Sequence, residues 1–507
     1  MKLNVDIFMQ IARNEKRYSR STKKILALHL IAALFLITPL CSIGQKSEQF
    51  VVDNRSIDIN HLNSEIESVM DTVIVPGMSL AVIDQGEVVF SGAYGVRGND
   101  EEVTEGTTFQ AASLSKVFLM YAALKMADEG LLDLNKPVYQ YLPNPRLSHD
   151  ERYLKITSRM LLFHTSGIED WENENNPQIL EIISDPDERF VYSGEGYNYL
   201  ADAIAEILNK PIVQYMKELV YEPLGLKHTY SAFEQGGTIP ANYALGHSRF
   251  GNLIKNQSKN LEPIPSSAIQ TTANDYAKMI IAMFDKNRIP TTLTDDFIKP
   301  VFNQDNGENF YMGHGFQVEV SDGDTLLLFW GSNPGYRAQM FYSVKKSSGL
   351  VLFTNGNRGE LVGKYLSKKI LCVDVNRFFD QGMFEQYPSN ACTLFKNYQD
   401  DKTKLRESLE RLIDDTQGNI GMNTLSELAY ILKNRHPAFV EEILEKNLEL
   451  YPNSAQTYWV KGKMKLREGE FQEALKSLHK AKEMGYDDNF LEFDIQICQD
   501  NLAESNR

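Results

Sequence analysis

Hydrophobic and polar positions alternate in short runs at both ends of the segment from about residue 65 to residue 375. Two β-prone runs, 77–83 and 87–92, are separated by Asp84-Gln85-Gly86, which is typical of a hairpin turn. Further β-prone runs cover 316–320, 325–330, 339–343 and 350–354. Longer runs with a helical period occupy the middle, at 114–129 and 197–209. Strands at both ends with helices between them predict an α+β domain whose antiparallel sheet is built from both ends.

The pattern weakens after Cys372 and then becomes helical. Residues 376–415 are polar and poorly periodic, which predicts a linker with a lead-in helix. From 416 to 507 the pattern is helical, with a break at 452–454 and a turn at Gly469. Small and large residues follow the order of a helix-turn-helix unit at Tyr458, Gly462, Leu466, Ala474, Leu478 and Ala481. This stretch resembles a tetratricopeptide repeat with a second, degraded unit at 428–450, so we expect an all-α region that offers a surface to a protein partner.

The first 44 residues differ from the rest of the chain. Residues 1–24 are rich in Lys and Arg, an apolar run follows at 25–40, and the small residues Ser42 and Gly44 come next. This succession predicts a signal peptide over residues 1–44 and a mature protein that is periplasmic or extracellular. The alternative is an uncleaved helix that anchors the protein in a membrane, although the run is shorter than the roughly 20 apolar residues that a spanning helix needs.

The charge balance restricts the partners of the protein. The whole chain has a net charge of −16, and residues 1–44 contain seven basic and two acidic residues, so the remainder has a net charge of −21. Such an acidic surface repels phosphate backbones, and we expect no nucleic acid as a partner. Three of the four cysteines remain after residue 44, so the chain has no disulfide framework.

The first candidate for chemistry is the segment 109–118, FQAASLSKVF. Ser113 and Lys116 are three residues apart at a predicted helix start, so both lie on one face of the helix. The hydroxyl then sits at the positive end of the helix dipole, which favours a developing alkoxide. Lys116 can act as a base if burial lowers its pKa from the usual value of about 10.4. By itself the S-x-x-K spacing is more often a helix cap followed by a surface lysine.

Two further segments contain candidate site residues. In 190–197, FVYSGEGY, Tyr192 lies in a glycine-rich loop before a predicted helix and can project its phenol into a cleft. In 329–336, FWGSNPGY, a β-prone run ends at Gly331, where a missing side chain lets a substrate approach the strand edge closely. Each segment also has a purely structural interpretation, a packed loop aromatic and a tight turn. Trp330 at this strand end is more typical of a core than of a binding site.

Taken together, these three motifs in this order resemble the serine β-lactamase and penicillin-binding-protein superfamily, closest to the class C enzymes. Further landmarks of that family are VPG at 75–77, LDL at 132–134, KPV at 136–138, ITSRMLLFHTSG at 156–167 and EPLGL at 222–226. The resemblance covers about 300 residues within a domain that we place at 45–375. It implies a β-lactamase/transpeptidase-like fold, an antiparallel sheet with helices and a helical subdomain.

The resemblance also implies roles for individual residues. Ser113 attacks a carbonyl group and forms an acyl-enzyme, and Lys116 and Tyr192 share the work of general base. The sequence does not decide which of the two takes the proton. The backbone N–H groups of Ser113 and Ser332 form an oxyanion hole, in which one donor typically contributes about 3–4 kcal/mol. Water then releases the acyl group, so the expected substrate is a small molecule or a peptide-like compound.

Two positions depart from the family pattern. The family usually has Asn two residues after the tyrosine, where this chain has Gly194. The third motif usually begins with Lys or His, which binds a substrate carboxylate, and here it begins with Phe329. Both changes weaken the expectation of penicillins or D-Ala-D-Ala peptides as substrates, because their carboxylates need a cation. Esters and uncharged amides become the more plausible substrates.

Other chemistry finds little support in the sequence. His164, His247 and His314 are too scattered for a zinc motif, and the chain has no P-loop and no G-x-S-x-G elbow. We therefore expect no metal and no other cofactor. The competing hypothesis is a catalytically weak hydrolase fold that serves as a binding scaffold, with the helical repeats as its partner-interaction module. Retention of Ser113, Lys116 and Tyr192 together favours the enzyme, whereas Gly194 and Phe329 favour the scaffold.

Overall fold

The computed structural model describes residues 49–505, with gaps. The residues outside the description are 1–48, 173–175, 232–240, 249–250, 252, 255–262, 304–309, 322, 374, 376–393, 395–401, 416–417, 419, 421, 423, 433–436, 487–490 and 506–507. The predicted signal peptide and most of the predicted linker therefore lie outside the described residues. Among the described residues no helix is long and apolar enough to cross a membrane.

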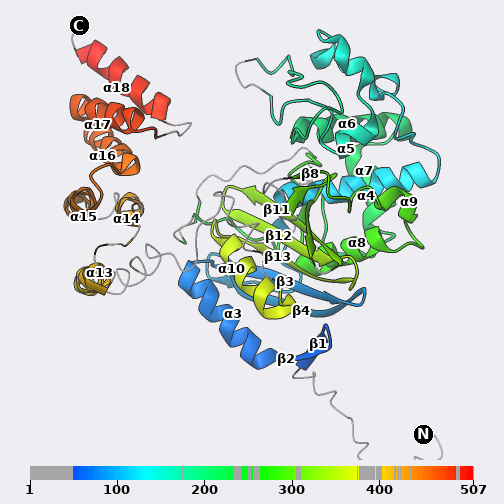
Figure 1. Cartoon of the computed structure of the whole chain (residues 1–507), viewed down its shortest axis with the longest axis horizontal. Coiled ribbons are helices and arrows are strands. Elements are labelled where there is room, and N and C mark those ends of the chain that lie inside the picture. The colour runs from blue at the N-terminus through cyan, green and yellow to red at the C-terminus, as the bar shows by residue number, and fades with distance from the viewer. Residues whose placement is uncertain are drawn as a thin grey trace, which may run out of the picture. The chain divides into compact units, whose positions relative to one another are not determined.

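A nine-stranded antiparallel sheet is the centre of the larger domain (Figure 1). Its strand order is β5-β4-β3-β13-β12-β11-β10-β9-β8. The strands are β3 (Gly77–Asp84), β4 (Glu87–Gly98), β5 (Glu101–Glu102), β8 (Phe302–Asn303), β9 (Phe310–Met312), β10 (Gln317–Ser321), β11 (Asp324–Asn333), β12 (Tyr336–Ser343) and β13 (Ser348–Thr354). Strand β3 from the start of the domain pairs antiparallel with β13 from its end. The predicted α+β fold with a sheet from both ends is confirmed.

The turn between β3 and β4 follows the sequence expectation. Gln85 and Gly86 have φ values of 50° and 78°, so two successive residues adopt the left-handed region. Two-residue hairpin loops need this conformation, because it matches the right-handed twist of the flanking strands. The hairpin places all eight residues of β3 in the core.

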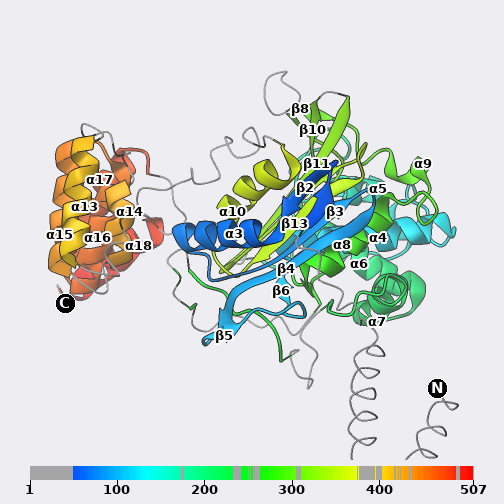
Figure 2. The same cartoon turned by 90° about the horizontal axis from the view of Figure 1, so that it is seen from below.

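Helices cover both faces of the sheet (Figures 1 and 2). Helices α3 (Ile59–Val73) and α10 (Gly359–Leu366) contact each other, and α10 packs on β12 and β13. On the opposite face, α8 (Ala273–Phe284) packs on β3, β4 and β13. Beyond it lie α4 (Ser115–Asp128) and α6 (Gly194–Leu208), which contact each other. These last two helices carry the sequence motifs with Lys116 and Gly194.

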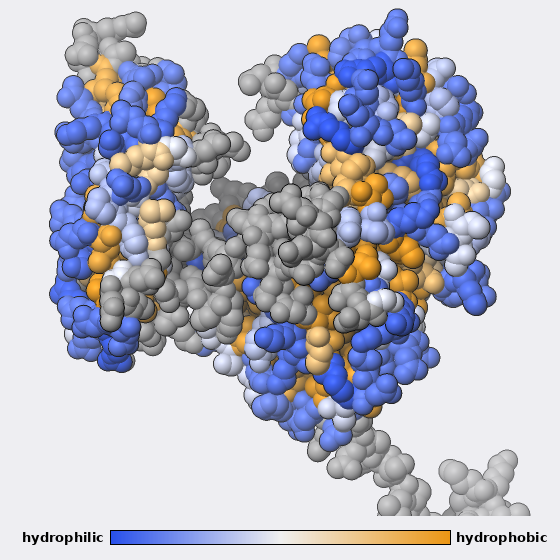
Figure 3. Space-filling view, viewed as in Figure 1, coloured by the Kyte–Doolittle hydropathy of each residue, from blue (hydrophilic) through white to orange (hydrophobic). Residues whose placement is uncertain are grey.

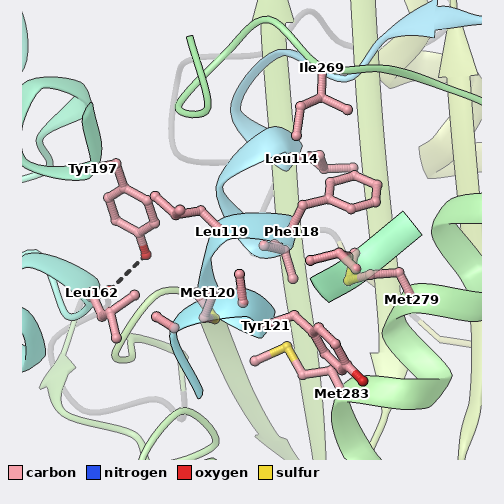
Figure 4. Packing of buried hydrophobic residues seen from close by; sticks show 14 of the residues in the cluster. Leu114, Phe118, Leu119, Met120, Tyr121, Leu162, Tyr197, Ile269, Met279 and Met283 are labelled. Carbon is pink, nitrogen blue, oxygen red and sulfur yellow. Dashed lines mark hydrogen bonds between the residues drawn. The ribbon is translucent and has the colours of Figure 1, made fainter. Parts of the chain in front are cut away.

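Helix α4 is buried on every side. All residues from Ser115 to Leu124 lie in the core, which is the behaviour of a helix without a polar face. Figure 4 shows its side chains packed against Met279 and Met283 of α8 and near Tyr197 of α6. The Tyr197 hydroxyl donates a 2.8 Å hydrogen bond to the Leu162 carbonyl oxygen, which satisfies this buried phenol. A polar side chain on α4 is therefore forced into an apolar environment.

The remaining elements of the larger domain are short. They are β1 (Gln49–Val52), β2 (Arg55–Asp58), β6 (Phe109–Gln110), β7 (Gln270–Thr271), α5 (Ser158–Leu162), α7 (Ile212–Met216), α9 (Thr291–Thr294) and the turns η2 (Ala112–Leu114), η3 (Val138–Gln140), η4 (Pro145–Leu147), η5 (Glu151–Lys155), η6 (Lys217–Tyr221) and η7 (Ser367–Leu371). Strands β6 and β7 form a separate two-stranded pair, and β6 comes just before η2 in the chain. The nucleophile segment is thus held between this pair and α4.

The C-terminal region is all-helical, as expected. Its helices are α13 (Lys402–Asp415), α14 (Thr424–Leu432), α15 (Pro437–Leu450), α16 (Ala455–Glu468), α17 (Phe471–Glu483) and α18 (Leu491–Ser505). Gly469 caps α16 with a φ of 77°, and Gly462 lets Leu478 of α17 pack directly on the α16 backbone. The region has a hydrophobic core of its own. Its assignment as tetratricopeptide repeats and the boundaries at 375 and 416 stay predictions.

Candidate active site

Ser113 lies on a tight turn that leads into α4. It is the middle residue of η2, and the Leu114 N–H donates to the Ala111 carbonyl oxygen at 3.0 Å. Ala112 directly before it has a φ of 47°, a left-handed conformation that is unfavourable for a residue with a Cβ atom. The strained turn and the helix start together place the half-buried Ser113 hydroxyl at the positive end of α4.

Gly331 of β11 packs against the backbone of this turn. A Cβ atom at position 331 would lie 2.7 Å from the Ala111 carbonyl oxygen and 2.8 Å from the Ser113 backbone nitrogen. The glycine is therefore required so that the strand can approach the nucleophile turn. The prediction that Gly331 also lets a substrate approach the strand edge stays a prediction.

The same contact brings the two predicted oxyanion-hole residues together. Strand β10 pairs with β11 only as far as Gln317↔Leu328, so the β11 edge beyond Leu328 faces η2 instead of a strand. Ser332 is exposed, follows Gly331 directly and lines the same cavity as Ser113. Two backbone N–H groups from a helix start and a strand edge are the arrangement that stabilises a developing oxyanion.

Lys116 lies in the first turn of α4, three residues after Ser113, and its side chain is completely buried. Its Nζ donates a 2.9 Å hydrogen bond to the Ser266 carbonyl oxygen. Burial lowers the pKa of Lys116 to about 7, against the opposing effect of the nearby Asp170 carboxylate. At neutral pH a large share of this lysine is consequently the free amine, which is the form that can accept a proton.

Tyr192 connects the lysine to the serine. Its side chain is hydrogen-bonded to Ser113, and the Lys116 Nζ lies 4.7 Å from the centre of its ring. Burial raises the pKa of Tyr192 well above its ordinary value, partly offset by the Ser113 hydrogen bond. The phenol is therefore neutral at physiological pH and can both donate and accept a proton. The structure brings Ser113, Lys116 and Tyr192 together at one site.

His164 contacts this group of residues through the ring of Tyr192. Its ring stacks on Tyr192 with 4.4 Å between ring centres, and its Nδ1 accepts a 3.0 Å hydrogen bond from the Ser193 N–H. Burial, followed by the positive field of Lys116, lowers the pKa of His164 well below its ordinary value. The neutral imidazole then has Nε2 as its second polar atom, which is buried and without a partner among the described residues. From the sequence alone, His164 had only a structural interpretation, as part of a family landmark.

These residues surround a cavity of about 710 Å³. Its walls come from η2, which leads into α4, from the 164–171 segment, from the loop before α6, and from β9, β10 and β11. The lining residues are Ser113, His164, Asp170, Trp171, Phe190, Tyr192, Ser267, Met312, Gly315, Phe316, Gln317, Phe329, Trp330, Ser332 and Asn333. In Figure 3, hydrophobic residues gather on the domain surface near β8 and α4 of Figure 1. The cavity is large enough for a small substrate, and six of its described lining residues are Phe, Trp or Tyr.

Gly194 stands where the family usually has an asparagine, and the structure shows what takes the place of its side chain. A Cβ atom at position 194 would lie 2.8 Å from two atoms of the Trp171 indole ring. The Gly194 N–H donates a 2.8 Å hydrogen bond to Oδ1 of Asp170. Gly194 itself is buried and does not line the cavity. Asp170 and Trp171 are thus the cavity residues in this corner, and the sequence analysis missed both.

Phe329 stands at the other departure from the family pattern. Its ring is only 7% exposed, belongs to the hydrophobic core and packs edge-to-face on Phe316 with 5.9 Å between ring centres. It nevertheless lines the cavity, next to Trp330. The interpretation of Trp330 as a core residue is wrong, since it is half-buried and faces the cavity.

Arg337 is the nearest arginine on the neighbouring strand, and its guanidinium is engaged elsewhere. It forms an ion pair with Glu360, with 3.2 Å between Nε and Oε2, and it donates to the Tyr336 carbonyl oxygen at 2.8 Å. It does not line the cavity. Arg337 therefore does not replace the cation that Phe329 lacks.

Comparison with known proteins agrees with this architecture. The sequence model of the family described as Beta-lactamase matches residues 62–373, which is more than half of the chain. Protein flp of Staphylococcus aureus (strain MW2) is 25% identical over 327 residues, covering 58% of this chain and 64% of that protein. The match thus spans less than two thirds of the length of that relative. A beta-lactamase of Pseudomonas fluorescens is 25% identical over 339 residues, covering 58% of this chain and 93% of that protein.

Solved structures show the same fold. A D-alanine carboxypeptidase from Burkholderia cenocepacia aligns with a TM-score of 0.52 at 18% identity, covering 62% of this chain and 99% of that one. An octameric penicillin-binding protein homologue from Pyrococcus abyssi aligns with a TM-score of 0.51 at 22% identity, covering 61% of this chain and 77% of that one.

Proposed function

Because the chain belongs to the Beta-lactamase family, we propose that it is a serine hydrolase that forms an acyl-enzyme on Ser113. The supporting observation is the contact series of Ser113, Tyr192 and Lys116. It begins at a hydroxyl on a helix start and ends at a buried amine whose pKa is about 7. Such a pKa suits a general base at neutral pH. A lysine buried only for structural reasons would more simply be replaced by an apolar residue.

In the proposed acylation, the free amine of Lys116 is the base. As the Ser113 Oγ forms a bond to the substrate carbonyl carbon, its proton passes to Lys116, with the Tyr192 hydroxyl as the relay. The raised pKa of Tyr192 argues against a phenolate as the base. When the carbonyl–leaving-group bond breaks, the same proton returns to the leaving oxygen or nitrogen. Water then attacks the acyl-enzyme and regenerates Ser113.

In this proposal, two backbone N–H groups donate hydrogen bonds to the substrate carbonyl oxygen as negative charge develops on it. The Ser113 N–H comes from the helix start, and the Ser332 N–H comes from the open edge of β11. Removal of one such donor in an acyl-transfer enzyme typically raises the barrier by about 3–4 kcal/mol. The packing of Gly331 against η2 keeps the two donors at a fixed separation.

The preferred substrates in this proposal are esters or amides without a carboxylate beside the reacting carbonyl. No Lys or Arg is among the described residues that line the cavity. A buried carboxylate there would lose a charge-assisted hydrogen bond of about 1.5–3 kcal/mol. That corresponds to roughly a 10- to 100-fold weaker affinity. Penicillins and cephalosporins carry such a carboxylate and are expected to be poor substrates.

Labelling with a fluorophosphonate probe tests the proposal, because the probe reacts only with an activated serine. We expect one adduct on Ser113 by mass spectrometry, loss of labelling in Ser113→Ala, and retained labelling in Ser166→Ala as the matched control. Ser166 is buried in the same family landmark as His164 but does not line the cavity. An unlabelled but folded parent protein would instead support the scaffold hypothesis.

A further inference from the structure

The described side chains that line the cavity include an acidic group but no lysine or arginine. Of the described residues that line it, Asp170 alone has an acidic side chain, and none is Lys or Arg. His164 is neutral there, since burial lowers its pKa well below the ordinary value. A chain with a net charge of −16 adds a general attraction for cations. The charges of the described lining side chains therefore disfavour the binding of an anionic ligand.

Asp170 is held in place without a cationic partner. Its Oδ1 accepts the Gly194 N–H at 2.8 Å, and its main-chain oxygen accepts the Glu195 N–H at 3.0 Å. The carboxylate therefore caps the first turn of α6, where the helix dipole favours negative charge. In the described part of the chain, no Lys or Arg approaches Asp170 within ion-pair distance. Among the described residues its Oδ2 has no hydrogen-bond donor, and Asp170 lines the cavity.

Aromatic rings line the same cavity as this carboxylate. Trp171 is the next residue in the chain, is 47% exposed and lines the cavity. Phe190 and Tyr192 line it from the loop before α6, and Trp330 lines it from β11. Aromatic faces attract ammonium groups through the ring quadrupole, most strongly for tryptophan. A carboxylate beside several aromatic rings is therefore a suitable binding site for an amine.

We propose that the cavity recognises substrates whose acyl group carries a protonated amine, with Asp170 as the counter-ion and Trp171 as the aromatic wall. This inference rests on the proposed hydrolase function and specifies its substrate class as esters or amides of amino acids. The ammonium group donates to Oδ2 of Asp170 while the reacting carbonyl lies at Ser113. Asp170 is thereby a specificity-determining residue.

The charge of Lys116 complements this arrangement. Lys116 is neutral when it acts as base, so in the reactive form no buried ammonium balances Asp170. A bound substrate ammonium supplies that balance. Because like charges repel, it also favours the free amine of Lys116 over its protonated form. Substrate recognition and the protonation state of the base are then coupled.

Equilibrium binding tests the inference without any turnover. The probes are 2-phenylethylammonium, 2-phenylethanol and phenylacetate, which share a ring and differ in charge. Two of the three tryptophans line the cavity, so intrinsic fluorescence reports occupancy. We expect the ammonium to bind about 10- to 100-fold more tightly than the alcohol, with phenylacetate weakest. In Asp170→Asn the preference for the ammonium should disappear. Equal binding of all three probes to the parent protein would overturn the proposal.

Turnover provides the second test. The substrates are the methyl esters of phenylalanine, in both enantiomers, and of 3-phenylpropanoic acid, which lacks only the amine. Asp170→Asn retains an oxygen that can accept the Gly194 N–H, so the helix cap survives. We expect kcat/KM for one phenylalanine ester to fall about 10- to 100-fold, and for the amine-free ester to change less than threefold.

The Asp170→Asn measurements have a matched control variant and a defined contradicting result. Asp185→Asn makes the same chemical change at an exposed aspartate that pairs with Arg152 away from the cavity lining, and it should leave both substrates unaffected. Equal losses on both esters in Asp170→Asn would mean that Asp170 acts through Lys116 or Tyr192 and would overturn amine recognition. Failure of the hydrolase proposal is distinguishable, since it would abolish fluorophosphonate labelling and leave the binding preference intact.

Discussion

The cavity has two walls that differ in how closely they follow the family pattern. The nucleophile wall consists of η2, the start of α4 and Tyr192, and it retains every residue type of the motifs. The substrate wall consists of the 168–171 loop, the start of α6 and strands β10 and β11, and it departs at Gly194 and Phe329. Under the proposed function, this contrast corresponds to a retained reaction type and a changed recognised group.

One residue of each wall illustrates a difference in packing. Lys116 is fully buried on a helix that is packed on every side, so its neighbours cannot change size without altering its pKa. Trp171 on the second wall is 47% exposed and contacts solvent. Substitutions there are accommodated more easily because no complete packing shell must adjust.

The largest expected effect joins the two walls at Gly331. In Gly331→Ala the new methyl group would lie 2.8 Å from the Ser113 nitrogen, so the strand and the nucleophile turn must separate. We expect kcat/KM to fall at least 100-fold, because displacements of about 1 Å have effects of that size. Overpacking should also lower the free energy of unfolding by about 1–3 kcal/mol. Gly106→Ala, which meets only the His228 side chain, is the control. Unchanged turnover would show that the contact does not position Ser113.

The pH dependence tests the nucleophile wall alone. Burial lowers the pKa of Lys116 to about 7, and only the deprotonated amine accepts a proton. Therefore kcat/KM for a neutral, amine-free ester should rise about tenfold from pH 6 to pH 8 and then level off. An amine-free ester excludes the titration of a substrate amine from the measurement. If activity rose only above about pH 9, Tyr192 would be the base, since its pKa is raised.

A smaller effect is expected from Phe329→His on the substrate wall. The imidazole would offer a donor where relatives have a cation, although Phe316 and the apolar core oppose its protonation. We expect kcat/KM to increase about 3- to 10-fold for a substrate with a free remote carboxylate, relative to its methyl ester. Phe329→Leu is the matched control without a donor. A parent enzyme that already prefers the acid would contradict the interpretation of Phe329.

The smallest effect is expected from removing residues 402–507. Every cavity-lining residue lies at or before Asn333, and the core clusters of the two regions share no buried residue. We expect kcat/KM on small esters to stay within threefold of the full chain, measured beside the melting temperature. Loss of turnover in a truncated protein that is still folded would place the C-terminal helices in the catalytic unit.

Much of the fold was predictable because local pattern and global structure agree. The 77–83 and 87–92 runs became β3 and β4, and the 114–129 pattern became α4. The S-x-x-K spacing also predicted that Ser113 and Lys116 lie together at a helix start, and the structure has Ser113 in η2 and Lys116 in the first turn of α4. These features depend on neighbours within a few residues, so the order of residues along the chain contains the necessary information.

The rest depends on contacts between distant segments. Asp170 and Trp171 lie 24 and 23 positions before Gly194 in the chain, and only the fold brings them to it. Gly331 meets η2 across more than 200 residues, so the order of residues along the chain does not reveal this contact. In the sequence, Gly194 in place of the family asparagine indicates only that a side chain is missing. The structure shows that the indole ring of Trp171 occupies the volume of that side chain.

The contact between Gly194 and Trp171 restricts the evolutionary routes open to this chain. Asparagine at position 194 would collide with the indole, so the family residue cannot return by a single step without damage. Shrinking Trp171 first removes the obstacle but leaves an aromatic wall incomplete. The two positions are therefore epistatic, and each substitution has a different effect in the background of the other. Directed evolution toward anionic substrates should consequently select changes at Trp171 before changes at Gly194.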